Sequence, residues 1–542
     1  MRRTVTRARY AAAFLALAAW AGTAVATAPG DAERIYRAGI LPSGQPLQGA
    51  REGGVTFSGQ AAACVNCHRR SGIGVNEGST VIPPISGKYL ARPGDRALPE
   101  AAVQSAGTAV SRRKPYDDQT LARAIRAGID SDGKPLGYLM PRYTLDPADM
   151  AVLIAYLKRL STQRVPGVAH DNLEFATIVT PDADPAERRG MLDVLEHFFS
   201  NKNHFELGHD PQLVSDRRRI HYRVTYQWHL HVWELTGPPG TWGTQLREHF
   251  RAQPVFAVIS GVGGRDWRPV HRFCQQQHLP CLFPNVRLPV VAPGDFYPLY
   301  FSRGVLLEAD LIRARWQAAR TTPRRVVQLF RQGDIGEAAA RALRGHRSDE
   351  AIEWIDRPVG ADGSAAELRA ALEAARPGDT LVLWLRAADL RELPAEAPAA
   401  DIFVSGLMGG LEDAPLPPAW RAAARLTYPV DLPQRRAMRL VQPLTWFRTQ
   451  QIPVVAERVQ VDTFIACQVL SEAVTHAFAD VVPDYLIEQI ENMISVKLLD
   501  GYYPRLGLAP GQRFASKGGY IIRLAPNPGG GLVVDSDWTV PQ

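Results

Sequence analysis

The sequence predicts a multidomain protein with a small all-α module near the N-terminus and a larger α/β region with parallel sheets in two lobes. The chain has 542 residues, too many for one hydrophobic core. Helical periodicity dominates the first part, as in the apolar stripe Met150, Leu153, Ile154 and Leu157. From residue 171 onward, short apolar runs alternate with helical patterns, which indicates strands covered by helices.

Residues 1–26 have the pattern of a secretory signal peptide. Arg2, Arg3, Arg7 and Arg9 form a basic start, and a short apolar run, rich in Ala and Leu, extends to Val25. This run is too short for a comfortable membrane span, and small residues at its end suit cleavage. The alternative is an uncleaved anchor. We expect export to the periplasm of a Gram-negative cell, with no transmembrane segment in the mature chain.

The motif Cys-x-x-Cys-His, at Cys64, Cys67 and His68, is the attachment signature of c-type haem. Two thiols at this spacing reach both vinyl groups of one haem, and the histidine that follows supplies an axial nitrogen. A redox dithiol would need a thioredoxin-like strand-to-helix context. A zinc site would need a second Cys or His pair, and the next cysteine is Cys274. The motif therefore predicts one covalent haem c.

A second axial ligand is expected from the loop before the last helix of this module. That helix is predicted to start at Pro147, with Asp146 as its N-cap, and to run to about Leu160. After the signal segment, the module contains only two methionines. Met150 lies on the apolar helix face, whereas Met140 lies in a loop and can point inward. His170 is the competing ligand, but it lies beyond the last helix.

These features resemble the class I cytochrome c domain family. The matching pieces are the haem motif, the loop from Pro84 to Gly87, the segment Met140-Pro141-Arg142-Tyr143 and the closing helix. In that family a methionine before the last helix is the second axial ligand, which here implies Met140. A thioether ligand favours reduced iron and raises the potential. The module spans residues 27–165 and is longer than a minimal cytochrome, through residues 89–115, whose role the sequence does not indicate.

The charge distribution bears on possible partners. Four arginines of the signal segment contribute to the formal net charge of +7, and apolar and charged contents of 46% and 22% are ordinary for a globular protein. Residues 27–167 carry 18 Lys and Arg against 12 Asp and Glu. A mildly basic module could steer an acidic redox partner, although an ordinary solvated surface explains the same balance. No feature predicts nucleic-acid binding.

The second region, residues 171–542, resembles the type I periplasmic solute-binding fold, which includes branched-chain amino acid receptors and other ABC-transporter substrate-binding proteins. Its most telling part is the strand and turn from Val255 to Gly261, followed by a helix and by Leu279 to Pro284. The further strands and helices expected are listed here: Phe175 to Thr180, Ile220 to Tyr226, Val461 to Ala479, Tyr485 to Leu498, and a β-rich end from Tyr520.

A glycine-rich turn in this region is the first candidate for ligand contact. Ser260, Gly261, Gly263 and Gly264 follow a strand and open a helix, where backbone N–H groups and the helix dipole favour an anion such as a carboxylate. A tight turn without a ligand explains the same glycines. Asp266 replaces the third glycine of a dinucleotide fingerprint, which disfavours that function. Arg303 is a second candidate for a ligand carboxylate, with a surface ion pair as its alternative.

The remaining cysteines suggest a disulfide and a buried thiol. Cys274 and Cys281 bracket a helix end and the next strand, and in an oxidising compartment we expect them to pair. Cys467 lies in an apolar helical pattern without an obvious partner. No Ser-His-Asp, paired-carboxylate or metal-hydrolase motif stands out, so no enzymatic activity is predicted.

Three hypotheses of function follow. The first is a periplasmic electron-transfer protein whose second region senses a small molecule or docks a redox partner. The second is an ABC-transporter-type solute receptor with an accessory haem. The third is a cytochrome subunit or electron acceptor for a quinoprotein alcohol or aldehyde dehydrogenase, since the haem module is similar to such cytochromes.

Overall fold

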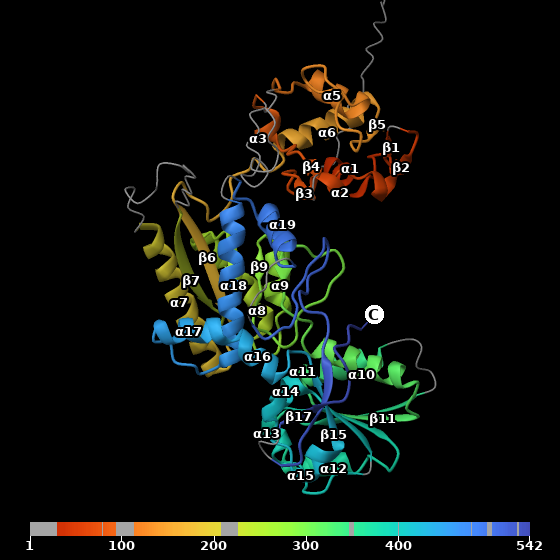
Figure 1. Cartoon of the computed structure of the whole chain (residues 1–542), viewed down its shortest axis with the longest axis vertical. Helices are drawn as coiled ribbons and strands as arrows, with labels where there is room; N and C mark the ends of the chain where they lie inside the picture. The colour runs from red at the N-terminus through yellow and green to blue at the C-terminus, as the bar shows by residue number, and fades with distance from the viewer. Residues whose placement is uncertain are drawn as a thin grey trace, which may run out of the picture. The chain divides into compact units, whose positions relative to one another are not determined.

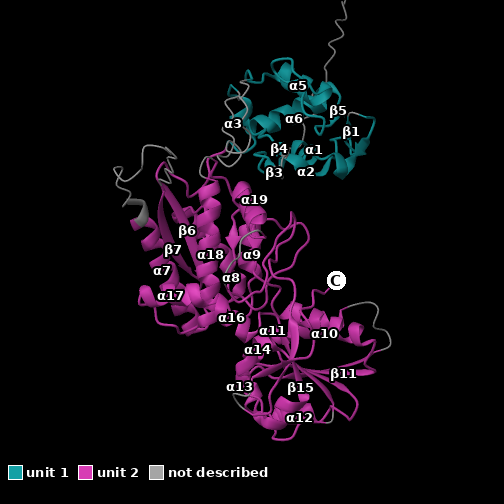
Figure 2. Ribbon diagram, viewed as in Figure 1, with its two compact units in different colours: residues 1–162 teal, residues 163–542 magenta. Residues whose placement is uncertain are grey.

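The structure is a computed structural model that describes residues 30–51, 53–77, 80–93, 113–207, 226–345, 352–398, 400–477, 480–495, 501–527 and 531–541. The chain divides into two compact units, Met1–Thr162 and Gln163–Gln542 (Figure 2). The signal segment, most of residues 89–115 and nearly all of the strand expected at 220–226 lie outside the described residues. Within the described ranges, no helix has the length and apolar character needed to cross a membrane.

The first unit is mainly helical. Its helices are α1 (Asp31–Ala38), α2 (Val65–His68), α3 (Gly87–Leu90), α5 (Asp118–Ala127) and α6 (Pro147–Arg159). The expected start of the last helix is confirmed, because the Asp146 carboxylate accepts a hydrogen bond from the Asp149 amide at 2.8 Å. The stripe from Met150 to Leu157 is buried, as predicted.

Five short strands accompany the helices of the first unit. One antiparallel sheet has the order β2-β1-β5, and a second sheet pairs β3 with β4. Their bounds are β1 (Gln48–Ala50), β2 (Thr56–Ser58), β3 (Val75–Glu77), β4 (Thr80–Ile82) and β5 (Arg142–Thr144). Strands of three residues are too short for an alternating pattern to be recognised in a sequence.

The core of the first unit forms where α1 meets α6. Ile35 and Tyr36 are fully buried, and the Tyr36 ring lies 5.4 Å from that of Tyr156. The Tyr36 hydroxyl donates a hydrogen bond to the Arg69 carbonyl at 2.7 Å, which ties α1 to the residue after α2. The two packed helices thus hold the haem motif against the core.

The second unit begins with a lobe built on a five-stranded parallel sheet of order β10-β9-β8-β6-β7 (Figure 1). Its strands are β6 (Asn172–Val179), β7 (Gln227–Glu234), β8 (Ala257–Ile259), β9 (Cys281–Leu282) and β10 (Pro298–Leu299). Its helices are α7 (Pro185–Leu207), α8 (Pro239–Ala252), α9 (Arg268–Gln276), α17 (Val441–Thr449), α18 (Glu457–His476) and α19 (Pro483–Met493). The two long late helices and the parallel pairing were predicted from the sequence pattern.

The second lobe contains a seven-stranded sheet of order β12-β11-β13-β14-β15-β16-β17. The first five strands are parallel, and the last two add antiparallel, which confirms the expected β-rich end. The strands are β11 (Arg325–Arg331), β12 (Glu353–Val359), β13 (Thr380–Trp384), β14 (Asp401–Val404), β15 (Ala424–Tyr428), β16 (Tyr520–Leu524) and β17 (Leu532–Val534). The helices are α10 (Val305–Ala319), α11 (Ile335–Arg344), α12 (Ala365–Leu372), α13 (Ala387–Leu390), α14 (Gly406–Gly409) and α15 (Pro418–Ala423).

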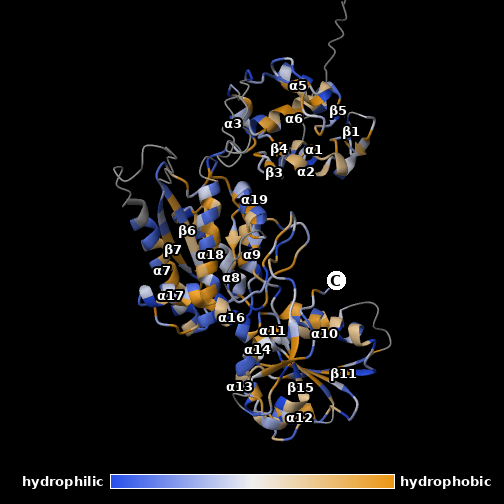
Figure 3. Cartoon of the chain, viewed as in Figure 1, coloured by the Kyte–Doolittle hydropathy of each residue, from blue (hydrophilic) through white to orange (hydrophobic). Residues whose placement is uncertain are grey.

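Burial explains why inner strands of both sheets are continuous apolar runs, in contrast to the edge strands β7 and β12. Every residue of β8 and of β13 is buried, as expected for parallel strands that are covered on both faces. Figure 3 shows hydrophobic colours on the central strands of the second lobe, with hydrophilic colours at the sheet edge near β11 and on the outer parts of the helices.

Three segments connect the lobes, and their positions determine where a cavity forms. The first joins β10 to α10, the second follows β15 and leads through α16 (Pro433–Arg439), and the third joins α19 to β16. Tyr300 of the first segment pairs with Phe514 of the third, and the Asp431 amide of the second donates to the Tyr502 carbonyl of the third at 2.8 Å. Residues that are far apart in the sequence therefore meet where the segments cross.

Candidate functional site

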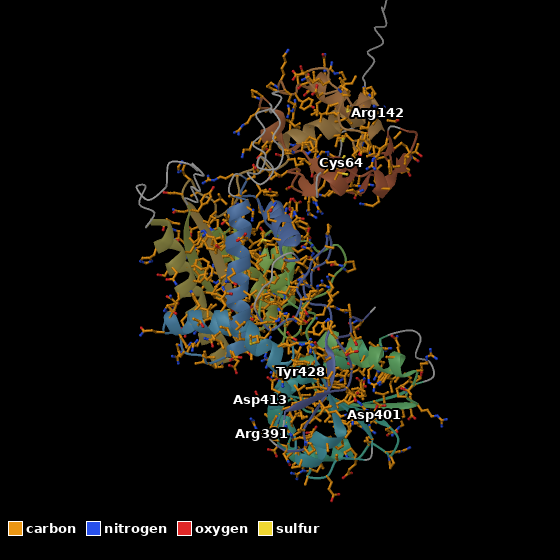
Figure 4. The ribbon with its side chains drawn as sticks, in the orientation of Figure 1. Cys64, Arg142, Arg391, Asp401, Asp413 and Tyr428 are labelled. Atoms are coloured by element: carbon orange, nitrogen blue, oxygen red, sulfur yellow. The ribbon has the colours of Figure 1, made fainter. Side chains whose placement is uncertain are left out.

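The haem motif occupies a short helix and the residue before it. Cys64 is the N-cap of α2, and Cys67 and His68 lie within its single turn (Figure 4 labels Cys64). Both cysteines are half-buried free thiols, and the His68 side chain is buried. The turn therefore presents two sulfur atoms and one imidazole from consecutive positions of one short element.

The orientation of His68 is set by a hydrogen bond to the loop that follows. Its Nδ1 lies 3.0 Å from the Pro83 carbonyl oxygen, and because a carbonyl only accepts, Nδ1 carries the proton. Burial lowers the pKa of His68 to about 4, although this hydrogen bond acts in the opposite direction. The imidazole is therefore neutral, and its Nε2 keeps a lone pair for a metal ion.

Gly74 allows the chain to approach this carbonyl. It has φ +78°, and a Cβ atom there would lie 2.1 Å from the Ile82 carbonyl oxygen. The Gly74 amide also donates to the His68 carbonyl at 3.2 Å. A side chain at this position would push away the segment that carries Pro83, so the glycine serves the orientation of the histidine.

The environment of Cys64 disfavours a redox dithiol. Burial raises the pKa of its thiol to about 12, and the Tyr143 hydroxyl is hydrogen-bonded to its sulfur. Reactive dithiols need a thiolate with a lowered pKa. Tyr143 is buried on β5 and lies opposite Gly49 in the pairing with β1, so a second element of the unit covers the motif.

Met140 lies on the loop immediately before β5. Its amide donates to the Gly137 carbonyl at 3.0 Å, and its half-buried side chain packs against the same apolar cluster as Cys64 and Val65. Strand pairing fixes the chain two residues later. The thioether is thus carried by a short anchored loop beside the cluster that contacts the motif.

These residues fit a covalently attached haem. Two thiols stand at the required spacing, an imidazole has its Nε2 available, and a thioether-bearing loop packs on the surrounding apolar cluster. The four side chains provide the thiols that attach a haem and the imidazole and thioether donors that bind its iron.

The backbone amides of the glycine-rich turn that starts at Ser260 have partners within the protein. The amides of Gly264 and Arg265 donate to the Asp182 carboxylate at 3.3 and 2.9 Å, and the Gly261 amide lies 3.2 Å from the Met191 sulfur. A carboxylate does occupy the turn, but it belongs to the protein itself. These three amides are therefore already bound within the protein, and contact of the turn with an external anion stays a prediction.

The glycines and Ser260 have packing roles in this turn. A Cβ atom at Gly263 would lie 2.9 Å from the Trp267 ring, and one at Gly264 would lie 2.5 Å from the Asp182 carbonyl oxygen. Ser260 is fully buried, and its hydroxyl oxygen accepts from the Asn285 side-chain amide at 2.8 Å.

Arg303 forms the ion pair that we considered as the alternative to ligand contact. Its guanidinium is partly exposed and bonds to Asp310, seven residues further along the chain. The residues on both sides of it, Ser302 and Gly304, line a cavity between the lobes.

Cys274 and Cys281 are buried thiols whose side chains are in hydrogen-bond contact in the structure. The sequence therefore placed the two residues together, and the disulfide between them stays a prediction. Burial raises the pKa of Cys274 well above its ordinary value, and a thiol that stays protonated oxidises slowly.

Comparison with protein families decides the nature of the first unit. Residues 54–161 match the cytochrome c family. The first unit carries a cytochrome c domain. The matched range includes the haem motif, the Pro83 carbonyl and the Met140 loop. Comparison of the whole chain with curated proteins found no match.

The second unit has the fold of periplasmic substrate-binding proteins. A fatty acid ABC transporter substrate-binding protein from Thermomonospora curvata superposes with a TM-score of 0.51 at 13% identity, over 70% of this chain and 95% of that protein. A branched-chain amino acid ABC transporter protein from Thermus thermophilus, solved with valine, has a TM-score of 0.49 at 12% identity, over 68% and 97% of the two chains. The chain thus joins a cytochrome c domain to a binding-protein-like domain.

The cavity of the binding-protein-like domain lies where the three connections between its lobes cross. Its lining includes Asn285 and Arg287 from the first lobe, Tyr300, Phe301, Ser302 and Gly304 from the first connection, Leu407 from the second lobe, Pro429 and Val430 from the second connection, Tyr503 from the third, and Arg458 and Asp462 from α18. Sequence analysis missed these residues. They come from widely separated segments, and none belongs to a recognisable motif.

Proposed function

We propose that this protein is an extracytoplasmic electron carrier in which one covalent haem c, ligated by His68 and Met140, works beside a domain that binds a small molecule. The orientation of His68 carries the proposal. Its Nδ1 is committed to Pro83, and its Nε2 is available, in a domain of the cytochrome c family.

The haem, once bound, supplies a one-electron couple, and the chain's own residues set its surroundings. Cys64 and Cys67 would hold it through two thioether bonds, so that it could not dissociate. Pro83 orients the His68 ring through Nδ1 and makes Nε2 a better donor. The Met140 thioether favours the reduced state. The buried apolar cluster around α1 and α6 excludes water, which also favours the reduced state because water stabilises the more highly charged one.

The binding-protein-like domain adds a receptor function to this carrier. Its fold and the cavity between its lobes support binding of a small solute. An ABC-transporter-type receptor with an accessory haem is the second candidate, favoured by the size of this domain. The identity of the redox partner, including a quinoprotein dehydrogenase, remains a separate proposal that rests on the similarity of the haem module to such cytochromes.

Native mass spectrometry of the full-length protein, produced in a host with haem-maturation machinery, tests both parts. We expect a mass that contains one haem, which survives denaturation, plus a small molecule that is lost on mild activation. Loss of the haem on denaturation would contradict covalent attachment. A haem-loaded protein that binds no small molecule from a broad collection of solutes would contradict the receptor function and leave the electron carrier.

A further inference from the structure

The cavity between the lobes is small, and its size limits what it can bind. Its volume is about 20 Å³. A water molecule needs roughly 10–15 Å³ on this scale, so the cavity has room for about one or two waters, or for a ligand of few non-hydrogen atoms. A branched aliphatic side chain does not fit without movement of the lobes.

Aromatic side chains fill the space on one side of the cavity. The Phe301 ring stacks on Tyr503 at 5.6 Å between centroids and on Phe283 at 4.4 Å. Phe283 and Phe301 are buried to at least 95%. This stack closes off the direction in which a larger apolar ligand would extend.

Asn285 provides a hydrogen-bonding group without a partner. The residue is only 6% exposed and lines the cavity. Its Nδ2 donates to the hydroxyl oxygens of Ser260 and Thr463 at 2.8 and 3.2 Å, which fixes the amide plane. Its Oδ1 has no hydrogen-bond partner among the residues that the structure describes. A buried acceptor left without a donor costs about 1–3 kcal/mol, so a donor from a ligand would be favourable there.

The charged groups around the cavity are already paired with one another. Arg287 bonds to Glu187 of α7, and Arg458 lies 3.5 Å from the Asp462 carboxylate. The Tyr503 hydroxyl lies 3.4 Å from the same carboxylate. Burial raises the pKa of Asp462 to about 7, although Arg458 acts in the opposite direction. Above that pH, the Arg287–Glu187 pair and the Arg458–Asp462 pair each have no net charge. A ligand with a net charge would leave one buried charge uncompensated.

We propose that this cavity binds a small uncharged molecule with an N–H or O–H donor, of the short amide or alcohol kind, whose donor bonds to Oδ1 of Asn285. The inference rests on the receptor part of the proposed function and names its ligand class. Arg458 and Ser302 line the same cavity and carry the N–H and O–H groups that could donate to the oxygen of such a molecule.

Three probes of nearly equal shape test whether the cavity prefers an uncharged ligand: acetamide, acetate and acetamidinium. Each is titrated at pH 8 into the full-length, haem-loaded protein by calorimetry, with leucine as a bulky comparison. We expect one acetamide per chain, and at least ten-fold weaker binding of the two charged probes and of leucine. Tighter binding of acetate or leucine would overturn the proposal, as would the absence of acetamide binding.

Substitutions at Asn285 test the contact itself. Asn285→Leu should weaken acetamide binding at least ten-fold. Asn285→Asp keeps acceptor oxygens and adds a negative charge, so it should shift preference towards acetamidinium even if the Leu variant folds poorly. Asn203→Asp, whose side chain bonds to the backbone of Trp228 away from the cavity, is the matched control and should bind acetamide as the parent does.

Unchanged acetamide binding in both Asn285 variants would overturn the assignment. The same samples are reduced and reoxidised to confirm the haem. Binding of a different solute with an intact haem would defeat only this inference, whereas the absence of any bound solute would also defeat the receptor part of the proposed function.

Discussion

Nδ1 of His68 and the carbonyl oxygen of Pro83 lie 3.0 Å apart, and this contact joins the haem motif to a loop fifteen residues away. It determines which imidazole nitrogen is left for iron. The segment with Ile82 and Pro83 can reach the ring only because Gly74, against which it packs, has no side chain.

Gly74→Ala should therefore disturb the haem site. Its Cβ atom would collide with the Ile82 carbonyl, so we expect a loss of at least ~2 kcal/mol in unfolding free energy. Thermal melting followed by haem absorbance, together with the midpoint potential, measures both effects. Gly133→Ala is the control, since Gly133 also has a positive φ but nothing lies within 4 Å of its added Cβ. Equal effects of the two substitutions would count against the role of the Pro83 loop.

Met140→Leu tests the second axial ligand. Without the thioether, the midpoint potential should fall by an amount on the order of 0.1 V, within the ~0.8 V that axial ligands control. Met150→Leu changes the other methionine of residues 27–165, which is buried on α6, and should leave the potential in place. If the potential responded to neither substitution, the assignment of Met140 would be wrong.

The state of the cysteines can be counted by alkylation without reductant. The chain has five cysteines, and two are expected to carry haem, which leaves Cys274, Cys281 and Cys467. All three are buried, and burial raises the pKa of Cys274 and Cys467, so the folded protein should resist the reagent. In denaturant, three thiols should react. A single reactive thiol would instead indicate a disulfide between Cys274 and Cys281.

Glu308 should make the stability of the binding-protein-like domain depend on pH. Burial raises the pKa of this carboxyl to about 7, although Ser405, Thr427 and the Leu407 amide are hydrogen-bonded to it. The folded state therefore holds a proton that the unfolded state has lost, and stability falls as pH rises from about 4.5 to above 7.

Glu308→Gln removes this group's effect on the pH dependence of stability. For the parent, the unfolding free energy should change by about 3 kcal/mol over this range, since one pKa unit corresponds to about 1.4 kcal/mol. Unfolding by denaturant from pH 4.5 to 8.5 should show a flatter dependence for the variant than for the parent. The exposed Glu392→Gln should keep the parent's profile. A variant with the same pH slope as the parent would show that Glu308 is not the group responsible.

Local signals predicted the parts of the fold that depend on neighbouring residues. Asp146 and Pro147 mark the start of α6, and the spacing of its apolar residues predicts its buried face. The haem motif was recognisable because its three functional residues lie within five positions. Such features are visible in a short window of sequence.

Contacts between distant residues could not be predicted in the same way. The turn at Gly264 suggested an anion, but the carboxylate that meets it belongs to Asp182, which is 82 residues away. Asn285 is oriented by Thr463, which is 178 residues away, so the cavity follows from how the lobes connect. The strands of the first unit are three residues long and leave no periodic signal.

A spectroelectrochemical titration of the full-length protein tests the central claim most directly. We predict that covalently bound haem is reduced and reoxidised reversibly in a single one-electron step, with the visible spectrum of histidine–methionine ligation in both states. A protein that carries no covalent haem, or whose haem shows no reversible one-electron step, would contradict the proposed function as an electron carrier.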